Sequence, residues 1–400
     1  MTEAVDIIVV GAGPSGLAAG CALAAAGVSV VVAGPPAPAG ADREGRTAAL
    51  FPEALGVLDA IGAWGDVAAL SAPIAGIRIV DDMGRLLRAP EVRFDGADTG
   101  LAVLAQNVPN GALLQALERR AEGLATLQRR PEAATVIASD ATGVTVQLAG
   151  GPSLRASLVV AADGRRSMAR AAAGIDVDEW RYEQAAITTA FAHSRPHGGV
   201  STEFHRPAGP FTVIPLPGNR SALVWLDTPA EAERLVALDD AAFCAIVQER
   251  LNGLLGAVRS VNPRVRYPMG GLIASKRGAR RIALVGETAH AFPPIGAQGL
   301  NLTLRDIAEL ARLVVAAQAD GTDIGADSVL AAYDTARSGD VARRVYGVDL
   351  LNRSLLAGPL VGLARGAGLH VLHAVPALKR FAMRQGYGAA EVAGRVSSTP

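Results

Sequence analysis

The sequence predicts an α/β fold that combines a parallel sheet, an inserted and mainly antiparallel sheet, and a helical C-terminus. Three observations lead to this fold class. Residues 6–32 read as strand, glycine-rich turn, helix and strand, and residues 281–313 as strand, loop and helix. Between them, residues 185–226 contain four short β-type runs separated by turn residues, which is the pattern of an antiparallel sheet.

Composition and charge narrow the class of protein. Half of the 400 residues are hydrophobic and 45 are glycine, as in α/β enzymes, and the length suits about two domains. The 38 basic and 38 acidic residues balance, so we expect no nucleic-acid partner. Cys21 and Cys244 are the only cysteines and the histidines are irregularly spaced, so we expect no disulfide framework and no metal. The N-terminal residues lack the pattern of an export signal, which favours a cytoplasmic protein.

The first segment has the pattern of a dinucleotide-binding βαβ unit. A strand at 7–10, a helix at 17–26 and a return strand at 28–32 surround a GxGxxG turn. Glycines at this spacing let the backbone approach a pyrophosphate at the helix N-terminus. The predicted contacts are Gly11, Ala12, Gly13, Pro14, Ser15 and Gly16. The alternative is that the glycines serve only the packing of helix on strand.

The end of the second strand departs from the usual dinucleotide-binding pattern. An acidic residue normally binds the adenosine ribose there, but residues 33–36 read AGPP. The nearest acids, Asp42 and Glu44, lie in a loop rich in glycine and proline. The sequence leaves open how the adenosine ribose is bound.

The following elements come from the same patterns. Apolar residues at helical spacing predict helices at 52–61 and 110–122. Alternation about the turn at 81–84 predicts a hairpin over 77–87, which we expect to begin the second sheet. Three short strands are predicted at 134–138, 143–148 and 154–161.

The second sheet is predicted from four runs, at 185–192, 199–205, 211–216 and 221–226, with helices over 231–255 behind it. This sheet is expected to cover the ligand site of the first domain. Phe204, Phe211, Val213 and Trp225 fall on its strands and are candidate substrate contacts in an aromatic pocket. The alternative, that they form the plain core of the sheet, is the commoner use of such residues.

The segment 281–313 has the pattern of an anion site. Residues 282–285 form a short apolar strand, and apolar residues recur at helical spacing from Leu300 onward. Prolines and glycines between them, Pro293, Pro294, Gly296 and Gly299, prevent regular structure. Backbone amides near residues 296–301 therefore open toward a helix N-terminus, where negative charge is stabilised.

This loop resembles a known family signature. Residues 293–306 read PPIGAQGLNLTLRD and are similar to the HP-I/V-A/G-GQG-x-N-x-G-x-x-D signature of flavin-dependent aromatic hydroxylases, and within them of the ubiquinone-biosynthesis hydroxylases. Pro293, Ala297 and Thr303 depart from the pattern, and Glu287 stands where the family has aspartate. Residues 162–170, ADGRRSMAR, resemble the family's GADGxxSxxR, and residues 46–64 its R-x-x-A-L…L-x-x-L-G-x-W stretch.

The resemblance implies a p-hydroxybenzoate hydroxylase-like fold with a Rossmann-like FAD-binding domain. That domain is expected to comprise residues 1–75, 101–175 and 272–340, with a substrate domain at 76–100 and 176–271 and a helical region at 341–400. FAD contacts are implied at Arg46, Gln106, Asp163, Gly286, Glu287, Pro294, Gly296, Ala297, Gln298, Gly299, Leu300 and Asn301. Each of two of these residues has an alternative without a cofactor contact: Arg46 as an exposed loop arginine, and Gln106 as a polar residue that flanks a helix. Asp163 can accept hydrogen bonds from the ribose or from loop amides.

The family also implies a reaction, the hydroxylation of an aromatic ring of a polyprenylated phenol in ubiquinone biosynthesis. FAD reduced by transiently bound NAD(P)H reacts with O2 to give a C4a-hydroperoxide that transfers OH to the substrate. The flavin carries this chemistry, so no catalytic side chain is assigned. Two alternatives stay open: another apolar aromatic or isoprenoid substrate, and a non-catalytic assembly subunit of a quinone-biosynthesis complex, which the missing ribose acid and Glu287 favour.

The C-terminal region suggests a membrane contact. Residues 355–383 combine Leu, Val and Ala with neighbouring basic residues, the composition of helices that lie among lipid headgroups. No run of about 18 uninterrupted apolar residues occurs, so we expect no membrane span. We expect peripheral contact with the inner face of the membrane or with a ubiquinone-biosynthesis complex. The alternative is a helical pair packed on the FAD-binding domain.

Overall fold

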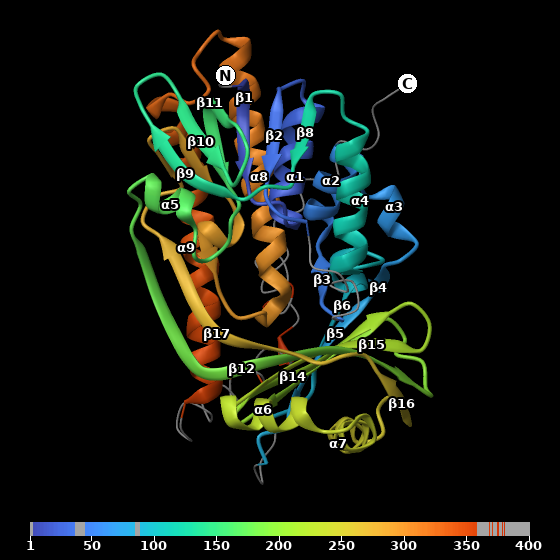
Figure 1. The fold of residues 1–400 in the computed structure, drawn as a ribbon. Helices are drawn as coiled ribbons and strands as arrows, with labels where there is room; N and C mark the ends of the chain where they lie inside the picture. Colours follow the sequence, from blue (N-terminus) through green and yellow to red (C-terminus); the bar gives the residue numbers. More distant parts are fainter. Residues whose placement is uncertain are drawn as a thin grey trace.

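The computed structural model describes residues 3–36, 45–84 and 89–357, together with residues 368, 370, 374, 375, 378 and 380. Within these residues the strands form sheets of eight, nine and three strands. Figure 1 shows the two large sheets at opposite ends of the molecule, with the long helices α8 (Gln298–Ala319) and α9 (Asp327–Leu356) running between them. The predicted α/β fold class is confirmed.

The eight-stranded sheet is parallel at its centre, where β19, β11, β1, β2 and β8 are neighbours. Ile7 and Val9 pack against helices on one face, and Ile8 and Val10 belong to a second core on the other face. Because both faces are covered, the strands read as continuous apolar runs. The strands are β1 (Glu3–Val10), β2 (Val30–Ala33), β8 (Leu127–Arg130), β9 (Ala134–Ser139), β10 (Val144–Leu148), β11 (Ser153–Ala161), β18 (Gly278–Ala279) and β19 (Ile282–Leu284). Its helices are α1 (Pro14–Ala25), α4 (Asn110–Glu122) and α5 (Met168–Ala172).

The nine-stranded sheet is mainly antiparallel, and only the pair β5 and β13 is parallel. Its strands are β5 (Gly76–Asp81), β6 (Val92–Asp95), β12 (Val177–His193), β13 (Val200–Arg206), β14 (Gly209–Leu216), β15 (Arg220–Asp227), β16 (Val258–Val261), β17 (Val265–Ala274) and β20 (His290–Ala291). Helices α6 (Pro229–Ala237) and α7 (Asp240–Leu251) cover one face. In Figure 1 they lie below this sheet, on the side away from α8.

A three-stranded sheet lies between the two large ones (Figure 1). Its strands are β3 (Thr47–Leu50), β4 (Ala72–Ile74) and β7 (Ala105–Pro109), and α2 (Pro52–Ile61) follows β3 directly. The short helix α3 (Gly65–Ala68) and the 3₁₀ turns η2 (Gly96–Thr99), η3 (Gly286–Thr288) and η4 (Ile295–Ala297) complete the fold. The helices predicted at 52–61 and 110–122 have these bounds in the structure.

Two sequence expectations need correction. The hairpin predicted over 77–87 pairs β5 with β6, so its second strand begins at Val92. Strand β17 was not predicted, and it contains Pro268, Gly270 and Gly271, which are uncommon inside strands. A β-carbon at Gly271 would lie 2.2 Å from atoms of the Trp180 ring, so close packing on β12 explains this glycine.

No helix in the part of the chain that the structure describes is both long and apolar enough to cross a bilayer. Most of the segment 355–383, which carries the membrane prediction, lies outside the described residues.

Candidate functional site

Three glycine-containing segments meet at the carboxyl ends of the parallel strands. A β-carbon on Gly11 would lie 2.3 Å from the carbonyl oxygen of Ala162, at the end of β11. Gly286 follows β19 with a φ of +61°, and its β-carbon would approach Ser15 Oγ at 3.1 Å and Thr303 Oγ1 at 3.0 Å. These glycines therefore let the three predicted motifs pack against one another. The carboxyl ends of parallel strands are where such sheets bind ligands.

Gly13 and Gly299 differ from these packed glycines. Apart from their neighbours in the chain, no atom of the described residues lies within 4 Å of a β-carbon built on either of them, so both leave open space next to a helix start. Gly13 is the N-cap of α1 and Ala297 the N-cap of α8, and neither side chain caps its helix. The first N–H groups of both helices have no acceptor within their helix, and both ends favour an anion. The residues present fit a pyrophosphate at α1 and a negatively charged ring edge at α8.

The flavin loop, residues 293–299, is held in an unusual backbone conformation. Gly296 and Ala297 are consecutive left-handed residues with φ of 69° and 55°. Asn301 fixes the end of this turn, since its Nδ2 donates to the carbonyl oxygens of Ala297 at 2.6 Å and Ala49 at 2.8 Å. Its Oδ1 accepts a 2.8 Å hydrogen bond from the Phe51 amide. Asn301 thus connects the loop to β3 and to the start of α2.

Arg46 lies where β3 begins, and its exposed guanidinium is 5.2 Å from the centre of the Tyr267 ring on β17. Near it, Thr47 Oγ1 and Asn110 Oδ1 are buried and have no hydrogen-bond partner among the residues that the structure describes. Buried polar atoms of this kind normally have a partner, so they fit the hydroxyl groups of a bound cofactor. Tyr267 had no sequence signal, because β17 itself was not predicted.

Gln106 lies on β7 with its Oε1 3.2 Å from the hydroxyl of Ser71, which donates to it. Its neighbour Asn107 is fully buried and donates from Nδ2 to the carbonyl oxygen of Pro215 at 2.7 Å. Asn107 therefore joins the small sheet to β14. The FAD contact of Gln106 stays a prediction.

Asp163 is oriented by its own segment. Its carboxylate accepts a 2.5 Å hydrogen bond from the Ser167 hydroxyl and one of 3.2 Å from the Ala169 amide. Arg170, which carried no role in the sequence analysis, is buried and donates to the carbonyl oxygens of Thr288 and Arg165. Burial lowers the pKa of Arg170, although Asp163 and Glu179 oppose that shift. Two roles were considered for Asp163. The structure contains its hydrogen bonds to the following loop, and its contact with the cofactor ribose stays a prediction.

Glu287 is exposed, and it follows the closely packed Gly286. The next residue, Thr288, is buried and donates from Oγ1 to the carbonyl oxygens of Ala161 and Val285. The turn is therefore fixed by Thr288, and Glu287 is left at the surface of the site.

The four side chains considered for an aromatic pocket are buried in a core, which is the alternative given for them above. Phe211 and Trp225 have ring centres 5.2 Å apart, and Trp225 lies 6.3 Å from Phe243 of α7. Phe204 and Val213 belong to the same core between the sheet and α6 and α7. Side chains alternate along a strand, so these residues share the helix-covered face. The opposite face carries Ile214, which packs with side chains of the small sheet and the flavin loop.

The adenosine end of the site is formed by close backbone packing. A β-carbon on Gly34 would lie 2.9 Å from the amide nitrogen of Ala12, so the end of β2 lies against the GxGxxG turn. The Gly34 amide donates to the carbonyl oxygen of Arg130 on β8. Asp42 and Glu44, the acids considered for the ribose, lie outside the described residues.

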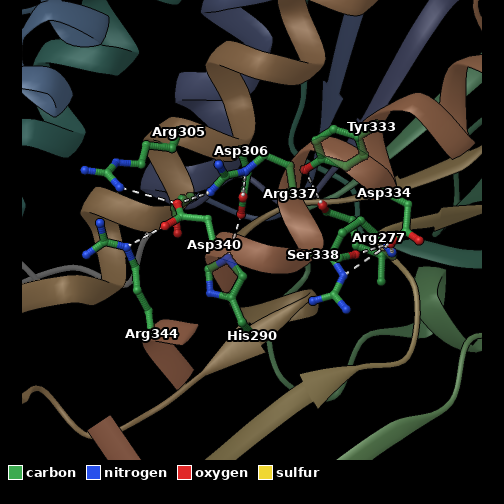
Figure 2. Close-up of polar contacts among 12 residues, drawn as sticks. Arg277, His290, Arg305, Asp306, Tyr333, Asp334, Arg337, Ser338, Asp340 and Arg344 are labelled. Carbon is green, nitrogen blue, oxygen red and sulfur yellow. Dashed lines mark hydrogen bonds and ion pairs between the residues drawn. The ribbon is translucent and has the colours of Figure 1, made fainter. Parts of the chain in front are cut away.

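A polar network joins α8 to α9 (Figure 2), and Arg344 connects it to Gln298 of the flavin loop. Asp306, which is 1% exposed, accepts hydrogen bonds from His290 Nε2 at 2.6 Å and from Arg337 Nε at 2.8 Å. Burial alone would raise the pKa of Asp306, but His290 and Arg337 outweigh it and hold that pKa below its ordinary value of 3.8. Beyond Arg337 the network continues through Asp340 to Arg344.

Sequence comparisons place this site within a known family. Residues 4–347 match the family model described as FAD binding domain. A ubiquinone hydroxylase of Rhodospirillum rubrum is 38% identical over 390 residues, which cover 96% of this chain and 89% of the relative. A 3-demethoxyubiquinol 3-hydroxylase of Escherichia coli is 29% identical, over 96% of this chain and 98% of that protein.

Solved structures share the fold. A p-nitrophenol 4-monooxygenase of Pseudomonas putida superposes with a TM-score of 0.78 at 21% identity, covering 97% of this chain and all of that one. A Klebsiella pneumoniae HpxO variant complexed with FAD gives a TM-score of 0.74 at 19% identity, covering 96% of this chain and 99% of that chain. The chain therefore belongs to the family of FAD-binding monooxygenases that includes the ubiquinone hydroxylases.

Proposed function

We propose that this FAD-dependent monooxygenase hydroxylates an aromatic ring of a polyprenylated phenol in ubiquinone biosynthesis, using NAD(P)H and O2. The observation that carries the proposal is the 38% identity to a ubiquinone hydroxylase along 96% of the chain. Bound FAD supplies the activation of O2 and the transfer of oxygen to the substrate. The tasks of this chain are to bind the cofactor, to orient it and to keep water from it.

The residues divide these tasks. Gly13 and the start of α1 would hold the pyrophosphate, and the first amides of α8 would face the negative charge of reduced FAD. The face of the large antiparallel sheet that carries Ile214 and Leu216 is apolar and covers the flavin loop, so it would receive the ring of the substrate and exclude water. The sequence contains no second glycine-rich βαβ unit that could bind NAD(P)H. This supports transient binding of NAD(P)H next to the flavin.

The substrate assignment can be tested in a host that makes ubiquinone. Deleting the gene should stop the pathway and accumulate one prenylated phenol that lacks a single hydroxyl group, and that compound should be hydroxylated by the purified protein with NAD(P)H and O2. Unchanged ubiquinone in the deletion, with flavin-dependent oxidation of another apolar compound, would favour the alternative substrate class. The visible absorption of flavin near 450 nm in the purified protein separates both from an assembly subunit without bound flavin.

We also propose that the C-terminal half of α9 contacts a membrane surface, because a polyprenylated phenol is retained in the bilayer. Tyr346 and Leu350 are 51% and 71% exposed on one helical face, and Leu351 and Leu356 are also exposed. Arg343 and Arg353 flank them with side chains 75% and 59% exposed, a composition suited to anionic headgroups. In flotation with anionic liposomes, L350E should bind less than the wild type while keeping its FAD. Equal flotation of the two proteins would contradict the proposal.

A further inference from the structure

We propose that Arg344, on α9, is a positioning residue for the flavin loop. Through Gln298 it fixes the orientation in which the loop presents its amides to reduced FAD. The inference rests on the proposed function only through its cofactor, which the family membership establishes. Arg344 does not need to contact the flavin for this role.

The first step is the orientation of the Gln298 amide. Arg344 Nη1 donates to Gln298 Oε1, and Gln298 Nε2 donates to the carbonyl oxygen of Gly296 at 3.0 Å. A guanidinium donates hydrogen bonds and cannot accept them, so Arg344 selects the oxygen end of this amide. The nitrogen end must then face Gly296. Without Arg344 this selection is lost, and a rotated amide would place its oxygen against the Gly296 carbonyl.

The second step concerns the strained backbone of the flavin loop, which the Gln298 amide helps to hold in place. Ala297 has a φ of 55°, a left-handed conformation that is unfavourable for a residue with a β-carbon. Such a conformation persists only when the surroundings hold it. Two side chains do so here, Gln298 on the Gly296 carbonyl and Asn301 on the Ala297 carbonyl. Arg344 therefore supports one of the two restraints on the turn that begins α8.

The third step is the rigidity of Arg344 itself. Its Nε donates to Asp340 Oδ1 at 3.0 Å, and Asp340 also accepts from Arg337 at 3.0 Å and Arg305 at 3.3 Å (Figure 2). Arg305 reaches Glu53 of α2 at 2.6 Å. Within the network, the charges of the three arginines are matched by Asp306, Asp340 and Glu53. Arg344 thus acts on the loop by fixing geometry more than by adding net charge.

The test measures the two-electron reduction potential of the FAD bound to the holoenzyme. This potential reports how tightly the protein binds reduced FAD relative to oxidised FAD, and its measurement needs no substrate. R344M should bind reduced FAD about tenfold less tightly relative to oxidised FAD, because the preorganised amides meet the charged form. A tenfold change corresponds to a fall of about 30 mV in the two-electron reduction potential. R312M is the control, since that side chain is 62% exposed on α8 and pairs with Glu309 outside this network, and its potential should equal that of the wild type. An unchanged potential in R344M would overturn the proposal.

The route through Gln298 has its own test. Q298M keeps the pair of Arg344 with Asp340 and removes the restraint on Gly296, so its potential should fall as in R344M. If Arg344 acts through Gln298, the double variant should match either single variant. If the shifts in potential of the two single variants add up in the double variant, Arg344 does not act through Gln298. If R344M fails to bind FAD, the potential of Q298M alone tests the proposal, and an unchanged value would overturn it. Failure to hydroxylate a prenylated phenol would leave these measurements intact, so the two proposals fail separately.

Discussion

The Phe51 amide donates a 2.8 Å hydrogen bond to Oδ1 of Asn301, although 250 residues separate the two. Phe51 is the N-cap of α2 and Asn301 lies in the first turn of α8, and both residues are buried. The same asparagine holds the carbonyl oxygens of Ala49 and Ala297. One side chain therefore fixes the distance between β3 and the flavin loop.

N301A should destabilise the protein by about 2–4 kcal/mol, because it leaves a buried amide and two carbonyl groups without their partner. FAD affinity should fall with it, since the loop loses its anchor. Urea unfolding of the apoprotein and titration with FAD measure the two effects. N301D retains the acceptor for the Phe51 amide but loses the donor to the Ala49 carbonyl oxygen. Its free energy of unfolding should therefore lie between those of the wild type and the alanine variant. Wild-type stability in N301A would contradict this account.

Gly13→Val should give a folded protein without bound FAD. Within the described part of the chain, a β-carbon at Gly13 has open space around it, so a side chain there occupies the space where the pyrophosphate is expected. Gly16→Val is the matched comparison, because its β-carbon would lie 1.8 Å from the Gly11 carbonyl oxygen and should disrupt the fold itself. Circular dichroism and flavin absorbance separate the two outcomes. A fully yellow G13V protein would exclude the pyrophosphate from this position.

Glu287→Ala should weaken FAD binding by about 1–3 kcal/mol, the usual cost of losing a hydrogen bond to a charged group. Glu287→Asp should bind FAD nearly as well as the wild type, since it restores the family's residue at an exposed position. Fluorescence titration of apoprotein with FAD gives both affinities. If the alanine variant binds FAD as tightly as the wild type, Glu287 is not a cofactor contact.

Asp306 should make stability depend on pH in the acid range. Its pKa is lower in the folded protein than the ordinary value of 3.8, so the unfolded chain takes up the proton more readily. The stabilisation is complete above that ordinary value and is lost as the pH falls toward the folded pKa. Urea midpoints measured from about pH 6 down to pH 3 should therefore decline, and D306N should show a smaller decline.

The asparagine variant should also be less stable at neutral pH by about 3 kcal/mol, because Arg337 loses one of its two carboxylate partners in a buried site and keeps only Asp340. D334N is a suitable control, since Asp334 is more exposed than Asp306 and contacts Arg277 rather than Arg337. An equal slope of stability against pH in D306N and wild type would mean that Asp306 does not titrate as described.

Much of the fold follows from local patterns. Continuous apolar runs predict β1 and β11 because both faces of their sheet are covered, and helical spacing predicts α2 and α4 with the bounds seen in the structure. Strand β17 could not be predicted in this way, because its Gly271 accommodates the Trp180 ring of β12. A residue chosen to suit a distant neighbour leaves no local signal.

The sequence by itself determined the α/β class, the order of the glycine motifs and the FAD-binding family, because these depend on short-range periodicity and on residues close together in the chain. Only the tertiary structure decided which face of the antiparallel sheet Phe211 and Trp225 occupy, because alternation along a strand does not say which side a helix covers. It also decided the partners of Asn301 and Arg344, since a buried polar group takes its hydrogen bonds from whichever elements the fold brings within reach.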